Sequence, residues 1–186
     1  MKNKGKLIII TGPSGVGKGT VVKELIANNK NFWLSISATT RQPRKGEIHG
    51  KEYYFYNRKE FKKKINEGLF LEWAEFAGNL YGTPAESVTE RINNGNMVIL
   101  EIEVEGAKQI REKYPDNLSI FLLPPSIEEL ERRIRNRGTD DENSILKRLK
   151  RAQHEIESSI DFDFAITNQN VDDSIRVILD LIKPSN

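Results

Sequence analysis

The chain has 186 residues, the length of one compact domain, with 37% hydrophobic and 30% charged residues. This composition excludes a membrane protein, since no stretch approaches the ~20 apolar residues of a membrane span, and the absence of cysteine excludes disulfide frameworks and thiolate zinc sites. Residues 1–58 carry 11 Lys and Arg against 3 Asp and Glu, and this basic first third favours a polyanionic ligand, either a phosphate-bearing small molecule or a nucleic acid.

The first predicted elements are a strand, a glycine-rich loop and a helix. An apolar, β-branched run covers residues 6–11, and a helical pattern covers residues 18–28. The residues between them fit the G-x-x-x-x-G-K pattern of a phosphate-binding loop, whose backbone N–H groups wrap a β-phosphate and whose lysine bridges the β- and γ-phosphates. The pattern predicts a nucleoside triphosphate site at Gly12, Pro13, Ser14, Gly15, Val16, Gly17, Lys18, Gly19 and Thr20.

The residue after the loop lysine departs from the usual pattern. A hydroxyl residue that helps to hold Mg²⁺ normally follows the lysine, but here Gly19 stands there and Thr20 comes one position later. We expect Mg²⁺ to be held through water molecules and Thr20.

Residues 35–94 interrupt the rhythm of strands and helices. Residues 52–56 and 71–76 have the pattern of antiparallel strands, and a short helix is predicted near residues 59–67. We expect an inserted lobe of mixed α and β structure.

The inserted lobe carries side chains suited to a nucleoside monophosphate. Arg41 and Arg44 near the hydroxyl groups of Tyr53 and Tyr81 suit a terminal phosphate, whose charge guanidinium and O–H donors can share. A carboxylate such as Glu72 suits guanine, which presents two adjacent donors at N1–H and N2–H₂, whereas adenine presents an acceptor at N1. A mismatched base would leave a buried charge unpaired.

After residue 94 the predicted strands and helices alternate. Strands are predicted at 97–102, 118–123 and 164–167, and helices at 106–113, 126–137, 144–158 and 171–182. Because parallel strands need crossover connections, this order predicts an α/β fold with a mostly parallel sheet and helices on both faces. Glu101 and Glu103 fall at the end of a buried strand. Burial of an unpaired carboxylate is energetically unfavourable, so these two residues are not expected to be part of the hydrophobic core.

Three sequence patterns together resemble the guanylate kinases, which are P-loop nucleoside monophosphate kinases. They are Ser-x-Ser-x-Thr-Thr-Arg-x-Pro-Arg-x-Gly-Glu from residue 35, Phe-x-Glu-Trp from residue 70 and Tyr-Gly-Thr from residue 81. The resemblance covers nearly the whole chain. It implies a three-layer P-loop fold with a core over residues 1–34, 95–136 and 144–186, a GMP-binding lobe over 35–94 and a short lid over 137–143.

The resemblance also implies roles for individual residues. Arg41, Arg44, Tyr53 and Tyr81 would hold the GMP phosphate, while Ser37, Glu72, Thr83 and Glu101 would surround the guanine. Arg133 and Arg137 share one helix face at i and i+4, and the resemblance implies that they close with Arg148 over the ATP phosphates. Asn168 would lie near the adenine. Glu103 stands where the family usually has Asp near the metal, and we expect it to reach Mg²⁺ through water.

The expected activity is transfer of the γ-phosphoryl group of MgATP to GMP, and also to dGMP, with Lys18, Arg41, Arg133, Arg137 and Arg148 as catalytic residues. The alternatives are an inactive guanylate-kinase-like module that binds a protein, or a related kinase with another phosphorylated acceptor. We expect ATP, GMP and Mg²⁺ as ligands, no nucleic acid or membrane partner, and a cytoplasmic location. The sequence leaves the choice between monomer and homo-oligomer open.

Overall fold

The computed structural model describes residues 5–136 and 141–183. By its contacts the chain forms two compact units: the first unit holds Met1–Ile9 and Asn31–Leu118, and the second unit holds Ile10–Lys30 and Ser119–Asn186. The division into core, lobe and lid stays a prediction, and residues 137–140 of that lid lie outside the described residues.

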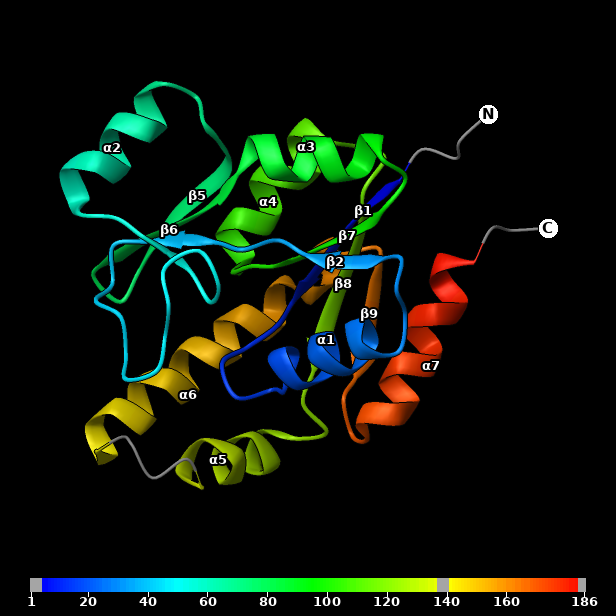
Figure 1. Cartoon of the computed structure of the whole chain (residues 1–186). Helices are drawn as coiled ribbons and strands as arrows, with labels where there is room; N and C mark the ends of the chain where they lie inside the picture. The colour runs from blue at the N-terminus through cyan, green and yellow to red at the C-terminus, as the bar shows by residue number, and fades with distance from the viewer. Residues whose placement is uncertain (1–4, 137–140, 184–186) are drawn as a thin grey trace. The chain divides into compact units, whose positions relative to one another are not determined.

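In the described part of the chain the larger sheet has five strands in the order β2-β7-β1-β8-β9 (Figure 1). They are β1 (Lys6–Thr11), β2 (Phe32–Leu34), β7 (Met97–Glu101), β8 (Leu118–Leu123) and β9 (Phe164–Thr167). β2 runs parallel to β7, and β9 runs parallel to β8. The middle strands are continuous apolar runs, as in Ile8–Ile10, which are fully buried, and such runs are typical of parallel strands covered on both faces. The predicted α/β class with a mostly parallel central sheet is confirmed.

The first unit also contains a smaller, mixed sheet in the order β4-β3-β6-β5. Its strands are β3 (Ala38–Thr39), β4 (Tyr54–Phe55), β5 (Phe70–Phe76) and β6 (Asn79–Pro84). β5 and β6 form an antiparallel hairpin, whose two turn residues, Ala77 and Gly78, have φ of 48° and 77°. Positive φ at both positions is the type I′ geometry, which matches the twist of the flanking strands.

The expectation of antiparallel strands in this region is wrong for residues 52–56. β4 pairs with β3 in the parallel direction, and Tyr54 N–H donates to the carbonyl of Ser37 at 2.9 Å. The connection between the two strands, residues 40–53, is long enough to bring the chain back in the same direction. β5 takes its antiparallel partner from β6, a strand that the sequence analysis did not predict.

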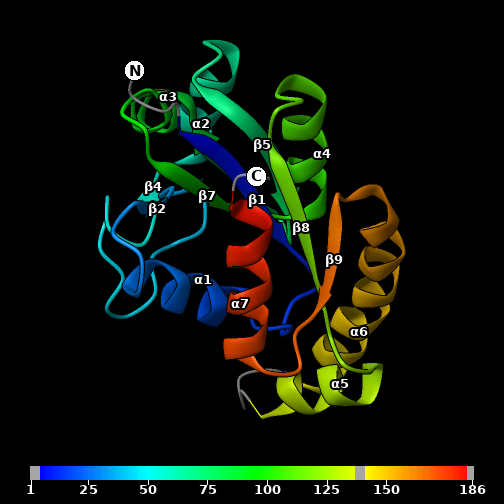
Figure 2. The same ribbon diagram turned by 90° about the vertical axis from the view of Figure 1, so that its right-hand side faces the viewer.

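The helices of the first unit are α2 (Arg58–Asn66), α3 (Ala85–Asn93) and α4 (Val104–Lys113). α2 begins at a capping box in which the Asn57 side chain accepts from Glu60 N–H and the Glu60 side chain accepts from Asn57 N–H. Phe61 of this helix is fully buried and packs on Phe70 at 4.6 Å between ring centroids. α4 lies along β5 (Figure 2).

The second unit contains α1 (Lys18–Ala27), α5 (Ile127–Arg135), α6 (Glu142–Glu157), the 3₁₀ helix η1 (Ser158–Asp161) and α7 (Val171–Ile182). α1 packs beside α7, and α5 packs beside α6 (Figures 1 and 2). α5 is shorter than predicted and ends at Arg135, with Ser126 as its N-cap residue. Over residues 5–136 and 141–183, no helix combines the length and the apolar character that a membrane crossing needs.

Candidate functional site

The glycine-rich loop joins β1 to the first residue of α1 in the second unit. Gly12, Gly15 and Gly17 have φ of 146°, 92° and 102°, a region that strains L side chains. A Cβ on Gly15 would lie 2.9 Å from a side-chain carbon of Ile134, and one on Gly17 would lie 2.7 Å from Nδ2 of Asn168. Glycine therefore lets the backbone take this path into the N-terminus of α1, where helix N–H groups favour an anion.

The lysine of the loop lies against the loop itself. Nζ of Lys18 donates to the carbonyl of Gly12 at 2.5 Å and lies 3.4 Å from that of Pro13. Gly19 and Thr20 follow on the first turn of α1 and are exposed. The loop thus holds a positive charge at the place where a phosphate is predicted to bind.

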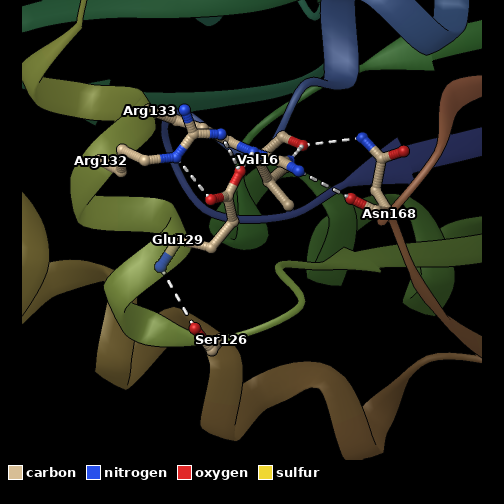
Figure 3. Close-up of polar contacts among 6 residues, drawn as sticks. All are labelled: Val16, Ser126, Glu129, Arg132, Arg133 and Asn168. Atoms are coloured by element: carbon tan, nitrogen blue, oxygen red, sulfur yellow. Dashed lines mark hydrogen bonds and ion pairs between the residues drawn. The ribbon is translucent and has the colours of Figure 1, made fainter.

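Two side chains from distant parts of the second unit hold the carbonyl of Val16 (Figure 3). Asn168 Nδ2 donates to it at 2.8 Å, and Arg133 Nη1 donates to it at 3.1 Å. Arg133 Nη2 also donates to the Asn168 carbonyl at 3.2 Å. This network fixes the loop two residues before Lys18, because the shared acceptor can move only if two hydrogen bonds break.

Both polar atoms of the Asn168 amide form hydrogen bonds within the protein. Its side chain is buried, at 3% exposed for the residue, and Oδ1 accepts from the hydroxyl of Ser174 at 2.9 Å. Asn168 follows β9, and Ser174 lies in the first turns of α7. The residue predicted to lie near the adenine therefore also binds the phosphate-binding loop.

The remaining arginines predicted to act on ATP come from α5 and α6. Arg148 of α6 donates from Nη2 to the hydroxyl of Ser14 in the loop at 2.9 Å. Arg133 of α5 donates from Nε to Glu129 at 2.8 Å, and hydrogen bonds from Arg132 and Arg133 lower the pKa of Glu129 to about 2 (Figure 3). Arg137 lies outside the described residues.

In the first unit, Arg41 is held by a carboxylate and by aromatic rings. Its guanidinium group donates to both oxygens of Glu47, at 2.8 and 3.0 Å, and this hydrogen bonding keeps the pKa of Glu47 below its usual value. The group lies 5.4 Å from the ring centroid of Tyr53 and 5.8 Å from that of Phe55. Glu47 also accepts from the backbone N–H of Arg44, whose own side chain is exposed.

The two predicted phosphate-binding tyrosines lie together in the same unit. The rings of Tyr53 and Tyr81 meet edge to face with centroids 6.2 Å apart. Burial raises the pKa of Tyr53, and the nearby charge of Glu101 raises it further, so its hydroxyl keeps its proton at neutral pH and can donate. Arg41, Tyr53, Tyr81 and Glu101 thus form one cluster.

The predicted guanine-binding carboxylate, Glu72, is buried and paired with Thr83. The two residues face each other across β5 and β6, and the Thr83 hydroxyl donates to Oε1 of Glu72 at 2.6 Å. Glu72 is 4% exposed, and burial raises its pKa to about 7 against the opposing effect of Thr83. Ser37, just before β3, is half-buried. This part of the site can accept two hydrogen bonds from a planar donor pair.

Comparisons with known proteins show the family to which the chain belongs. A family model described as guanylate kinase matches residues 4–185. A guanylate kinase of Prochlorococcus marinus strain MIT 9312 is 63% identical over 98% of this chain and 100% of its own. The chain belongs to the guanylate kinase family.

Two further guanylate kinases extend this result. One from Synechococcus elongatus is 54% identical over 94% of this chain and 95% of its own. The crystal structure of guanylate kinase from Anaplasma phagocytophilum superposes with a TM-score of 0.80 at 33% identity, covering 98% of this chain and 86% of that one. The predicted resemblance to guanylate kinases is confirmed.

The residues named for Mg²⁺ supply hard oxygen ligands. Thr20 offers an exposed hydroxyl, and Glu103 is the N-cap residue of α4, close enough to Glu72 to raise the pKa of that carboxyl. Among the described residues no group of three or more His, Asp or Glu side chains could form a cage for a metal. Mg²⁺ in general keeps several waters and binds substrate phosphates together with one or two carboxylates, and it rarely occupies an all-protein cage.

Three residues that contact the predicted ones, Glu129, Glu47 and Ser174, had no role assigned from the sequence. Glu129 lies four residues before Arg133 on one helix face, a spacing that could have identified it. Glu47 lies six residues after Arg41 in a loop, and Ser174 reaches Asn168 from α7. Neither Glu47 nor Ser174 has a helical or strand spacing to its partner, so these two contacts are seen only in the folded chain.

Proposed function

We propose that the protein transfers the γ-phosphoryl group of MgATP to GMP, and also to dGMP, giving ADP and the nucleoside diphosphate. The observation that carries the proposal is the buried Glu72 carboxylate, paired with Thr83 in the unit that also holds the arginine and tyrosine cluster. Guanine presents N1–H and N2–H₂ to such a carboxylate, while adenine would leave it facing an acceptor. Ser37 and Glu101 complete the guanine site.

The GMP phosphate binds to Arg41, Arg44, Tyr53 and Tyr81. Arg41 already forms two hydrogen bonds with the planar carboxylate of Glu47, the same fork geometry in which a guanidinium binds a phosphate. Arg44 is exposed and its backbone is anchored on Glu47, so its side chain can join the bound phosphate.

ATP binds through the phosphate-binding loop, residues 12–20, with Asn168 near the adenine. Lys18, Arg133, Arg137 and Arg148 neutralise the charge on the transferring group, and Arg41 does so on the acceptor phosphate. The acceptor oxygen of GMP is already anionic, so no general base is required, and catalysis consists of in-line positioning and charge neutralisation.

Mg²⁺ accompanies ATP in this proposal and supplies positive charge to the phosphate oxygens. The Thr20 hydroxyl and the Glu103 carboxylate would hold it, through water where the side chains do not reach. The longer side chain of Glu103, in place of the aspartate usual in the family, suits such indirect contact.

The experiment that tests this function is a coupled assay of ADP release with MgATP and GMP, dGMP, AMP, UMP or CMP at equal concentrations. We expect strong turnover with GMP and dGMP only. Turnover with another acceptor would establish a kinase of different specificity. Binding of GMP without any turnover would favour the inactive protein-binding module, a reading opposed by the presence of Lys18, Arg133 and Arg148.

The partners that follow from this function are small molecules. Lys18, Arg41 and Arg44 of the basic first third belong to the two proposed phosphate sites, and the sequence carries no recognised nucleic-acid-binding motif, so no nucleic acid or membrane partner is proposed. We place the enzyme in the cytoplasm, where a kinase that consumes ATP and GMP finds its substrates.

A further inference from the structure

β5 presents Glu72 from the edge of the mixed sheet, and α4 covers that edge (Figure 2). Trp73 pairs with Gly82 of β6. In an antiparallel pair, alternate residues turn their backbone N–H and C=O groups away from the partner strand. On an edge strand such groups need another partner.

Side chains of α4 provide those partners. Gln109 donates from Nε2 to the carbonyl of Trp73 at 2.7 Å and accepts at Oε1 from the N–H of Trp73 at 3.2 Å. Lys113 donates from Nζ to the carbonyl of Leu71 at 3.2 Å. The two residues on either side of Glu72 are therefore anchored to one helix, and the Gln109 amide takes the place of a neighbouring strand.

The same helix face also touches the Glu72 side chain. Gly106, Gln109 and Lys113 lie at i, i+3 and i+7 and so share one face of α4. A Cβ on Gly106 would clash with Oε2 of Glu72, so only glycine leaves the carboxylate its present position. The positive charge of Lys113 acts on Glu72 as well, opposing the effect of burial on its pKa.

We propose that Gln109 is a positioning residue for base selectivity: together with Gly106 and Lys113 it fixes β5 so that Glu72 meets both guanine donors. This inference rests on the proposed function. The backbone of residues 71 and 73 determines the position of the Glu72 backbone between them. Gly106 leaves room for the Glu72 carboxylate at the end of its side chain. Loss of the Gln109 hydrogen bonds would free the strand at Trp73, directly after Glu72, without removing any group proposed to touch the nucleotide.

The test compares Gln109→Leu with Lys108→Ala, an exposed neighbour on the same helix. Kinetic constants are measured for GMP and for inosine monophosphate, which keeps N1–H and lacks the 2-amino group. For Gln109→Leu we expect the KM for GMP to rise about tenfold, since two hydrogen bonds are lost. The KM for ATP and kcat should stay within about twofold, and the preference for GMP over inosine monophosphate should fall by about fivefold.

The inference is overturned if folded Gln109→Leu matches Lys108→Ala in both GMP constants, or if the KM for ATP rises as much as that for GMP. A wild-type protein that does not phosphorylate GMP would instead contradict the proposed function. If Gln109→Leu does not fold by circular dichroism, Gln109→Met decides, because methionine has about the length of glutamine and favours the helix but lacks the amide that holds Trp73. Reduced preference for GMP in Gln109→Met supports the inference, and unchanged preference overturns it.

Discussion

The carboxyl group of Glu72 has a pKa of about 7 in the folded protein and an ordinary value of 4.5 in an unfolded chain. Between these values the folded protein holds a proton that the unfolded chain has lost. The free energy of unfolding therefore falls as the pH rises from about 4.5 to 7 and is not recovered above it. In the proposed function guanine needs the charged form, so the carboxyl group proposed to bind the base also destabilises the empty protein.

Glu72→Gln removes this titration. We expect the difference in unfolding free energy between variant and wild type to shift in favour of the variant by about 2 to 3 kcal/mol between pH 5 and pH 8, because most of the titration between 4.5 and 7 falls in this range. Urea denaturation at both pH values measures it. A difference that is the same at pH 5 and pH 8 would show that Glu72 has an ordinary pKa.

The same substitution changes base selectivity. The amide that replaces the carboxylate offers one acceptor and one donor group, so it cannot accept from both N1–H and N2–H₂ of guanine. We expect the ratio of kcat/KM for GMP over AMP to fall by about two orders of magnitude. Unchanged selectivity would remove Glu72 from base recognition.

The structure supplies a matched control for Arg41. Arg58 also donates to both carboxylate oxygens of a glutamate, Glu75 in the first unit, at 3.0 and 3.1 Å, but from Nη2 alone and on the surface. Arg41→Met should lower kcat/KM for GMP by about 100-fold or more, because a charged phosphate donor is lost. Arg58→Met should change it by less than about twofold. Equal effects in the two variants would contradict the phosphate assignment.

At the scale of the elements, the phosphate-binding loop depends on a contact between segments far apart in the sequence. The carbonyl of Val16 accepts from Asn168, which follows β9, and from Arg133 of α5. Asn168 in turn accepts from Ser174 of α7. Two helices and one strand end of the second unit therefore fix the loop conformation that leads to Lys18.

Asn168→Ala should loosen this loop. We expect the KM for ATP to rise about fivefold to tenfold, with the KM for GMP within about twofold, because one hydrogen bond to the loop and one to Ser174 are lost. Gln169→Ala is the control, since its side chain is exposed and adjacent. If the two variants have equal KM values for ATP, Asn168 does not position the loop.

The elements that the sequence predicted well are those with long or distinctive patterns. The strand 6–11, the strand 118–123 and the helix 171–182 match β1, β8 and α7 at both ends, because runs of buried apolar residues and helical spacing are local signals. β2 and β3, of three and two residues, carry no such period. The parallel direction of β4 depends on a long loop, which no local pattern reveals.

The same limit applies to the site. Arg41, Tyr53, Tyr81, Glu72 and Thr83 could be predicted because their residue types suit phosphate and guanine and because their spacing resembles a known family. The residues that hold them in place, such as Gln109 beside Trp73, act through backbone groups 36 positions away in the sequence. Backbone acceptors have no residue signature, so such contacts are found only in the folded chain.

At the scale of the whole molecule, the residues predicted to bind the phosphoryl donor ATP and those predicted to bind the acceptor GMP belong to different compact units. The phosphate-binding loop, Arg133, Arg148 and Asn168 belong to the second unit, while the arginine and tyrosine cluster and the Glu72–Thr83 pair belong to the first. The family model of the guanylate kinases matches residues 4–185, a range that contains both sets of residues. We expect both sets to serve one transfer of a phosphoryl group.

The most direct test follows the phosphoryl group itself. Protein, Mg²⁺, GMP and ATP labelled with ³²P at the γ-position are mixed, and the products are separated by chromatography. We expect label to appear in the β-phosphate of GDP at the rate at which ADP forms, and Lys18→Ala to abolish both the labelling and the ADP formation. Label released as inorganic phosphate, or none transferred to GMP by the folded protein, would contradict it.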